Sequence, residues 1–178
     1  MMYYSRKSPR MQHYDYSNEN YYFITICTHN KKCLFGRPEE NNFLRKLVEQ
    51  HISKIETHYQ CVQLDKYVVM PNHIHMILVL NQGQQVNIQQ VIGQFKSGVT
   101  RTARKNTGEK QIWQRSFHDH VIRNQAGYEK IWLYIENNPI KWEEDCFYPK
   151  DSKNQNVREG QDPPLQMGRF SHVSIHRQ

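Results

Sequence analysis

VQLDKYVVMPNHIHMILVL, residues 62–80, is the stretch that decides the fold we expect for this chain. Its first half, residues 62–70, is rich in β-branched and aromatic side chains and predicts a strand. Pro71 and Asn72 interrupt that strand, and the apolar run over residues 73–80 predicts a second one. Because the connection is so short, the two strands should lie side by side and antiparallel in one sheet.

Strands and helices alternate on both sides of this pair. Two further strands are predicted over residues 21–28 and 118–123. Apolar residues at helical spacing predict three helices, over residues 42–57, 88–103 and 125–138. The order β-α-β-β-α-β-α matches the ferredoxin-like split β-α-β plan. We therefore expect an α+β fold in which helices pack against a four-stranded antiparallel sheet and a C-terminal helix follows.

The length of 178 residues suits one domain and a tail. We expect a domain over residues 1–145 and a flexible tail over 146–178, where apolar periodicity is lost and Lys, Asn, Gln and Pro are frequent. The longest strongly apolar run, residues 74–80, is far shorter than the roughly 18 residues that a membrane span needs. Four scattered cysteines without a C-x-x-C pair indicate neither a disulfide framework nor a zinc knuckle, so a cytoplasmic setting is expected.

The charge of the chain suits a phosphate-rich partner. Lys and Arg number 24 against 17 Asp and Glu, which gives a formal net charge of +7 and a pI of about 9.2. Basic side chains are interleaved with tyrosines in residues 1–20, and they also cover the polar surface of the helix predicted over 88–103. Simple solvation of these surfaces is the alternative interpretation.

His73 and His75 are the clearest candidates for chemistry. In a strand, the period of two points both imidazoles to the same face and Ile74 to the other. Two adjacent imidazoles form half a metal site, although hydrogen-bonded structural histidines are the alternative. His118 and His120 repeat the same spacing on another predicted strand.

The last predicted helix carries a tyrosine outside its apolar stripe. Tyr128 belongs to that stripe with Ile131 and Ile135, so packing explains it. Tyr134 lies off the stripe, on the same side as Asn138 four residues later. A phenol and an amide oxygen could therefore approach one metal together. The alternatives are a tyrosine at a sheet edge and an asparagine that stops the helix before proline.

These segments, taken in order, resemble the REP-associated tyrosine transposases, IS200-like members of the single-tyrosine HUH transposase superfamily. The resemblance covers about residues 8–148. It rests on the blocks SPR (8–10), YDYS (14–17), YFITICT (22–28), LFG (34–36), VMPNHIH (69–75), IGQFKS (92–97), IWQR (112–115), DHVIRN (119–124) and YIENNPIKW (134–142).

The resemblance implies a metal-dependent nuclease that cleaves and rejoins single-stranded DNA near palindromic hairpins. His73 and His75 match the family's metal-binding histidines, and Asn138 falls where relatives place a third ligand for Mg²⁺ or Mn²⁺. Tyr134 matches the nucleophile, which would form a 5′-phosphotyrosine. The candidate DNA contacts are Tyr3, Tyr4, Arg6, Lys7, Arg10, Lys96, Arg101, Arg104, Arg115 and Arg123.

Two other functions compete with this interpretation. A non-catalytic, RRM-like nucleic-acid-binding protein would explain the charge and the tyrosines. A zinc hydrolase would explain the His-x-His pair but would need a third ligand and an activated water. The sequence leaves open whether the protein is a monomer or a homodimer.

Overall fold

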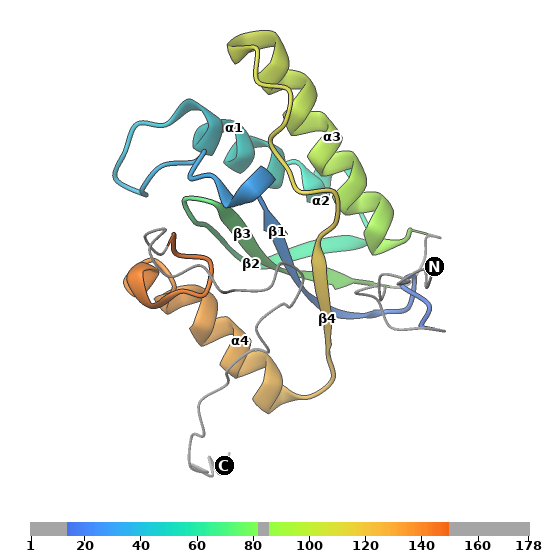
Figure 1. Cartoon of the computed structure of the whole chain (residues 1–178). Coiled ribbons are helices and arrows are strands. Elements are labelled where there is room, and N and C mark those ends of the chain that lie inside the picture. Colours follow the sequence, from blue (N-terminus) through green and yellow to red (C-terminus); the bar gives the residue numbers. More distant parts are fainter. Residues whose placement is uncertain (1–13, 82–85, 150–178) are drawn as a thin grey trace, which may run out of the picture. The chain divides into compact units, whose positions relative to one another are not determined.

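A single antiparallel sheet organises the part of the chain that the structure describes. The structure is a computed structural model that describes residues 14–81 and 86–149 (Figure 1). The strand order is β2-β3-β1-β4, and each neighbouring pair is antiparallel. The predicted ferredoxin-like α+β fold is therefore confirmed. The strands are β1 (Asn20–Cys27), β2 (Val62–Val69), β3 (His73–Leu80) and β4 (His118–Ile122).

Helices cover both faces of this sheet. Figure 1 shows α1 and α3 on one face and α4 on the other. Within the described ranges, none of the helices combines the length and apolarity that crossing a bilayer requires. The helices are α1 (Phe43–Ile52), α2 (Ile55–His58), α3 (Ile88–Thr107) and α4 (Gln125–Asn137), with short 3-10 turns η1 (His29–Lys31) and η2 (Trp142–Glu144).

The two faces of β3 differ in what they bury. Its even-numbered residues join the larger core cluster, which also contains apolar residues of α1 and α3. On the opposite face, Ile77 packs with Ile131 and Ile135 of α4 in a smaller cluster. Because side chains alternate along a strand, His73 and His75 lie on the α4 face together with Ile77.

The single helix predicted over residues 42–57 is wrong, because the structure has two helices there. α1 ends at Ile52, and α2 begins at Ile55. The hydroxyl of Ser53 donates to the carbonyl of Gln50 at 3.1 Å, and such a bond competes with helical pairing. Ile52 and Ile55 are both buried. The apolar spacing therefore continues from one helix into the next, and it does not indicate the break between them.

A buried arginine ties α1 to the strand that leads into the histidine motif. Arg45 is 6% exposed, and its guanidinium donates to the carbonyls of Phe35 at 3.1 Å, Gly36 at 2.7 Å and Val69 at 2.6 Å. Since Val69 ends β2, Arg45 fixes the backbone just before the turn that carries Pro71 into β3.

Packed structure continues past residue 145, where we placed the end of the domain. Phe147 is buried, and its ring centroid lies 4.6 Å from that of His73. Most of the predicted tail over 146–178, namely residues 150–178, lies outside the described residues.

Candidate active site

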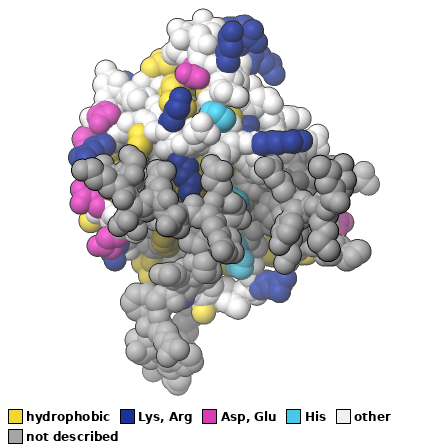
Figure 2. All heavy atoms as spheres, in the orientation of Figure 1, with side chains coloured by type: hydrophobic (Ala, Val, Ile, Leu, Met, Phe, Trp, Pro, Cys, Tyr) yellow, Lys and Arg dark blue, Asp and Glu magenta, His cyan; other side chains and the backbone are white. Residues whose placement is uncertain are grey.

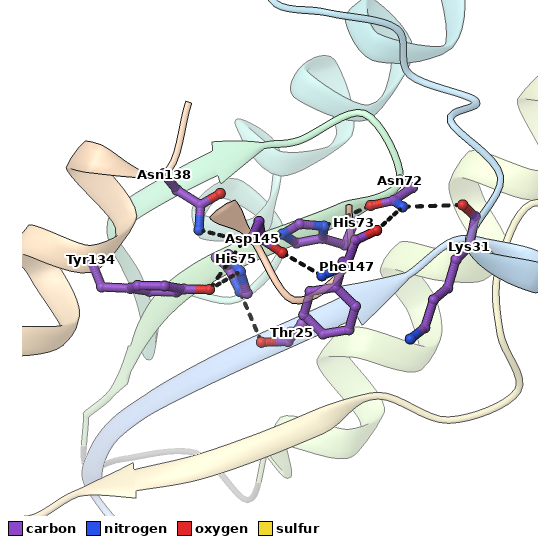
Figure 3. A network of polar contacts seen from close by, with 9 residues as sticks. All are labelled: Thr25, Lys31, Asn72, His73, His75, Tyr134, Asn138, Asp145 and Phe147. Carbon is purple, nitrogen blue, oxygen red and sulfur yellow. Dashed lines mark hydrogen bonds and ion pairs between the residues drawn. The ribbon is translucent and has the colours of Figure 1, made fainter. Parts of the chain in front are cut away.

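Two buried imidazoles form the centre of the site. His73 is 0% and His75 is 2% exposed, and their ring centroids are 4.4 Å apart. In the sheet, His73 pairs with Cys27 and His75 with Thr25 of β1. Both rings therefore point to the α4 face, as the strand period predicts (Figure 3).

Neighbouring side chains fix the orientation of both rings. The Nδ1 atom of His73 lies 2.8 Å from Oδ1 of Asn72, and Nδ1 of His75 lies 2.9 Å from Oγ1 of Thr25. The amide nitrogen of Asn72 donates to the carbonyls of Lys31 and Phe147, so its oxygen faces His73. An amide oxygen only accepts, and His73 must therefore carry its proton on Nδ1. The lone pair of its Nε2 is left available, as a metal ligand requires.

Tyr134 reaches this pair from α4. Its hydroxyl oxygen lies 3.2 Å from Nε2 of His75, and it donates to Oδ2 of Asp145 at 3.3 Å. Phe23 packs against both rings, stacked on His75 with centroids 5.3 Å apart and edge-on to Tyr134 at 6.2 Å. The predicted convergence of the two imidazoles and the phenol is thus present in the structure (Figure 3).

Asp145 is the residue of the site that sequence reasoning missed. Its Oδ2 lies 3.9 Å from Nε2 of His73, and its Oδ1 accepts from the backbone N–H of Phe147 at 2.7 Å. One ligand atom from each of His73, His75 and Asp145 lies within 4.8 Å of the others. Glu143 and Glu144 precede Asp145 in a segment without periodicity, so no pattern indicated which carboxylate turns inward.

Asn138 also lies in the site. It is 4% exposed, and its Nδ2 donates to Oδ2 of Asp145 at 3.0 Å. Two buried atoms of residues in this site have no hydrogen-bond partner in the described part of the chain: Oδ1 of Asn138 and Nε2 of His73. Buried polar atoms are rarely left unpaired, so both atoms are candidate ligands of a cation.

Burial determines the charge state of the site. It lowers the pKa of His73 well below its usual value, with further contributions from His75 and Lys31. Burial alone lowers the pKa of His75 to about 3. The pKa of Tyr134 is raised by burial and by the nearby Asp145. The imidazoles are therefore neutral, as metal ligands must be, and the phenol keeps its proton unless a positive charge lies close to it.

This set of donors fits a divalent cation. Two imidazole nitrogens, a carboxylate and an amide oxygen offer mixed nitrogen and oxygen ligation. Oxygen ligands suit Mg²⁺ and Mn²⁺, and imidazole adds affinity for transition metals. The ring nitrogens that face away from the site are held by Asn72 and Thr25, an outer shell of the kind that metal-binding histidines have.

The predicted DNA contacts fall into three groups. Tyr3, Tyr4, Arg6, Lys7 and Arg10 lie outside the described residues. Arg123 is exposed between β4 and α4. The remaining four lie along one open groove of about 830 Å³, which two further basic residues also line: Lys96, Arg101, Arg104 and Arg115, with Lys105 and Lys110.

The groove runs between α3 and the segment that precedes β4. No acidic residue lines it, and Figure 2 shows dark blue Lys and Arg side chains gathered over the upper end of the molecule, where α3 ends. The ammonium of Lys96 donates to the carbonyls of Gln114, Arg115 and Ser116. Lys96 thus holds one wall of the groove in place, a structural role that the sequence did not indicate.

Comparison with known families agrees with this site. Residues 15–138 match the model of a family described as transposase, IS200 like. The chain belongs to the IS200-like transposase family. The match contains both histidines, Tyr134 and Asn138, and it ends seven residues before Asp145.

Individual relatives of this IS200-like transposase support the same assignment. An uncharacterized protein of Haemophilus influenzae is 37% identical over 80% of this chain and 93% of its own length. A REP-associated tyrosine transposase of Escherichia coli is 33% identical over 44% of this chain and 45% of its own length. The resemblance seen in the sequence is therefore confirmed.

A solved structure shares the fold. The structure of a REP-associated tyrosine transposase bound to a REP hairpin matches with a TM-score of 0.60 and 24% identity, over 75% of this chain and 74% of that one. A putative transposase from Deinococcus radiodurans matches with a TM-score of 0.49 and 16% identity, over 72% and 95% of the two chains.

The buried imidazoles predict a stability that depends on pH. Unfolded histidine titrates near pH 6.5, whereas burial holds the pKa of His75 at about 3 and that of His73 well below the usual value. Between these values the unfolded state binds more protons, so stability is lost as the pH falls below 6.5. In EDTA, the free energy of unfolding should drop by about 2 kcal/mol per imidazole from about pH 7.5 to about pH 5.

Chemical denaturation at both pH values measures this effect. In His75→Gln the pH-dependent loss should be about half that of the wild type, because one of two titrating imidazoles is gone. Equal unfolding free energies of the wild type at the two pH values would contradict the neutral, buried pair.

Proposed function

We propose that this IS200-like transposase is a metal-dependent endonuclease that cleaves and rejoins single-stranded DNA near hairpins, with Tyr134 as the nucleophile. One observation carries the proposal. The phenolic oxygen of Tyr134 lies 3.2 Å from Nε2 of His75, beside the unpaired Nε2 of His73 and the carboxylate of Asp145. A tyrosine that only packed at a sheet edge would have no reason to meet this donor set.

His73 and His75 would hold the cation, with Oδ1 of Asn138 and Oδ2 of Asp145 as its oxygen ligands. When bound, a divalent ion neutralises charge on the phosphate oxygens and polarises the phosphorus. Nε2 of His75 and Oδ2 of Asp145 lie within hydrogen-bond distance of the phenol, so the nucleophile stands next to the ligands that would hold the cation. The family suggests Mg²⁺ or Mn²⁺, and the donor set supports either.

In the cleavage step, the phenolic oxygen forms a bond to phosphorus and the bond from phosphorus to the 3′-oxygen breaks. The phenol loses its proton and the leaving oxygen gains one, so the products are a 5′-phosphotyrosine and a free 3′-hydroxyl. The phosphodiester bond energy is retained in the adduct. Attack by a 3′-hydroxyl then reverses the step and joins strands without a nucleotide cofactor.

The substrate would be hairpin or single-stranded DNA, bound by a monomer or a homodimer in the cytoplasm. A related REP-associated tyrosine transposase has been solved with a REP hairpin, and the basic groove along α3 offers cations to a phosphate backbone. We include the N-terminal residues Tyr3, Tyr4, Arg6, Lys7 and Arg10, and Arg123, among the proposed contacts.

Tyr134→Phe should abolish the covalent adduct with DNA while hairpin affinity changes less than about twofold, because a single hydroxyl supplies the nucleophile. Incubation with labelled hairpin DNA and Mn²⁺, followed by denaturing electrophoresis, measures the adduct. Tyr67→Phe, which removes the hydroxyl of an exposed tyrosine on β2, is the matched control and should form the adduct as the wild type does. An undiminished adduct in Tyr134→Phe would move the nucleophile elsewhere.

His73→Ala and Asp145→Ala should each weaken Mn²⁺ binding, His73→Ala by more than about 100-fold. Titration calorimetry measures the affinity without any need for catalysis. Asn138→Ala tests the amide ligand separately, and His120→Ala, exposed on β4, is the control that should bind Mn²⁺ normally. Wild-type affinity in His73→Ala would reject the site, and wild-type affinity in Asp145→Ala or Asn138→Ala would remove that ligand from it.

Removing Arg101 and Arg104 together should lower the slope of log affinity against log salt by about 2, since each lost phosphate contact accounts for about 0.9 on duplex DNA. Binding of a hairpin at several salt concentrations, without metal, measures the slope. Lys46→Ala, an exposed cation on α1 outside the groove, should leave it unchanged. An unaltered slope in the double variant would exclude the groove as a phosphate-binding surface.

A further inference from the structure

An irregularity in β2 turns two consecutive charged side chains toward the helix that carries Tyr134. In the pairing of β2 with β3, Leu64 lies opposite Leu78 and Lys66 opposite Ile77, so the register skips Asp65. Such a bulge leaves two residues on one strand facing one on the other, and it interrupts the alternation of side chains. β2 is an edge strand of the sheet, where bulges are common.

Both side chains of the bulge contact α4. Oδ2 of Asp65 accepts from the hydroxyl of Tyr128 at 2.8 Å. The ammonium of Lys66 pairs with the carboxylate of Glu136 and lies 4.0 Å from the ring centroid of Trp132. Tyr128 and Glu136 are eight residues apart, so the two contacts lie about 12 Å from each other along the axis of α4.

The buried apolar contacts of this helix are few. Ile131 and Ile135 are the buried apolar residues of α4, and the cluster that they join is the smaller of the two in the described structure. Tyr134 lies between the two polar contacts, six residues after Tyr128 and two before Glu136. The burial and the acceptor at Asp65 raise the pKa of Tyr128 to about 12, so its hydroxyl remains a donor at neutral pH.

We propose that Asp65 and Lys66 are positioning residues that set the rotation and the axial register of α4 and thereby place the phenolic oxygen of Tyr134 in the active site. This inference rests on the proposed function. The side-chain contacts of Asp65 and Lys66 described above all go to α4, so both residues act through the helix.

The geometry explains why the rotation of α4 matters for the reaction. Side-chain atoms at the outer radius of a helix lie about 5–6 Å from its axis, so a rotation of about 15° moves such an atom by about 1.5 Å. A misplacement of about 1 Å can slow a positioned reaction about 100-fold. A small apolar interface tolerates a rotation of this size, whereas two polar contacts at separate points along the helix do not.

The test compares Asp65→Ala, Lys66→Met and the double variant with Gln63→Ala, an exposed control on the same strand. Single-turnover adduct formation on saturating hairpin DNA with Mn²⁺ should slow about tenfold or more in Asp65→Ala, in Lys66→Met and in the double variant. Hairpin affinity and the unfolding midpoint should stay close to the control values. Lys66→Arg, which keeps the charge and the ring contact, should restore the rate.

Tyr128→Phe provides an independent check from the other side of the contact. It should slow adduct formation as Asp65→Ala does, and combining the two changes should add little, because both remove the same hydrogen bond. Wild-type rates in Asp65→Ala and Lys66→Met would overturn the inference. Equal losses of hairpin affinity and rate would also overturn it, because they would indicate a DNA contact.

Hydrogen exchange of the α4 amides separates this inference from the proposed function. Exchange in α4 should be faster in Lys66→Met than in Gln63→Ala, whether or not the protein cleaves DNA. If the wild type forms no adduct, the proposed function fails, and Asp65 and Lys66 have no nucleophile to position. If the wild type forms the adduct but α4 exchange and rate are unchanged in the variants, only the positioning role fails.

Discussion

Two neutral imidazoles buried on one face of β3 are the constraint on which the rest of this structure depends. A buried ring nitrogen without a partner costs about 1–3 kcal/mol, so the surroundings must satisfy four of them. Asn72 and Thr25 pair with the two Nδ1 atoms, and Tyr134 approaches Nε2 of His75. Nε2 of His73 remains unpaired beside a carboxylate. The one ring nitrogen that is left unpaired thus lies where His75 and Asp145 also offer a candidate ligand atom.

The two faces of the sheet differ in how many apolar side chains they bury, and this difference leaves space for the site. The face under α1 and α3 buries most of the apolar side chains, and hydrophobic burial there supplies most of the stability. The α4 face has only a small apolar cluster. Its helix is held in addition by polar contacts from Asp65 and Lys66. Weak apolar packing leaves room for imidazoles and a phenol, but it makes the position of Tyr134 dependent on those contacts.

The site extends beyond the region that the IS200-like family model matches. That match ends at residue 138, whereas Asp145 and Phe147 belong to the following segment. Asn72 links the two parts, since its oxygen faces His73 and its nitrogen donates to the carbonyl of Phe147. The turn before β3 and the segment after α4 therefore fix each other. The family match spans the two histidines and the tyrosine, but the carboxylate has to be found in the structure of this chain.

The sequence by itself determined the features that depend on local periodicity: the strands and helices, the shared face of His73 and His75, and the position of Tyr134 off the apolar stripe of its helix. These follow from backbone geometry within a few residues. Only the tertiary structure decided where Asp145 turns inward, that Ser53 separates α1 from α2, and that the bulge at Asp65 redirects β2. Each of these depends on partners distant in the chain or on a local hydrogen bond that competes with the regular pattern. The spacing of apolar residues in the sequence indicates neither kind of interaction.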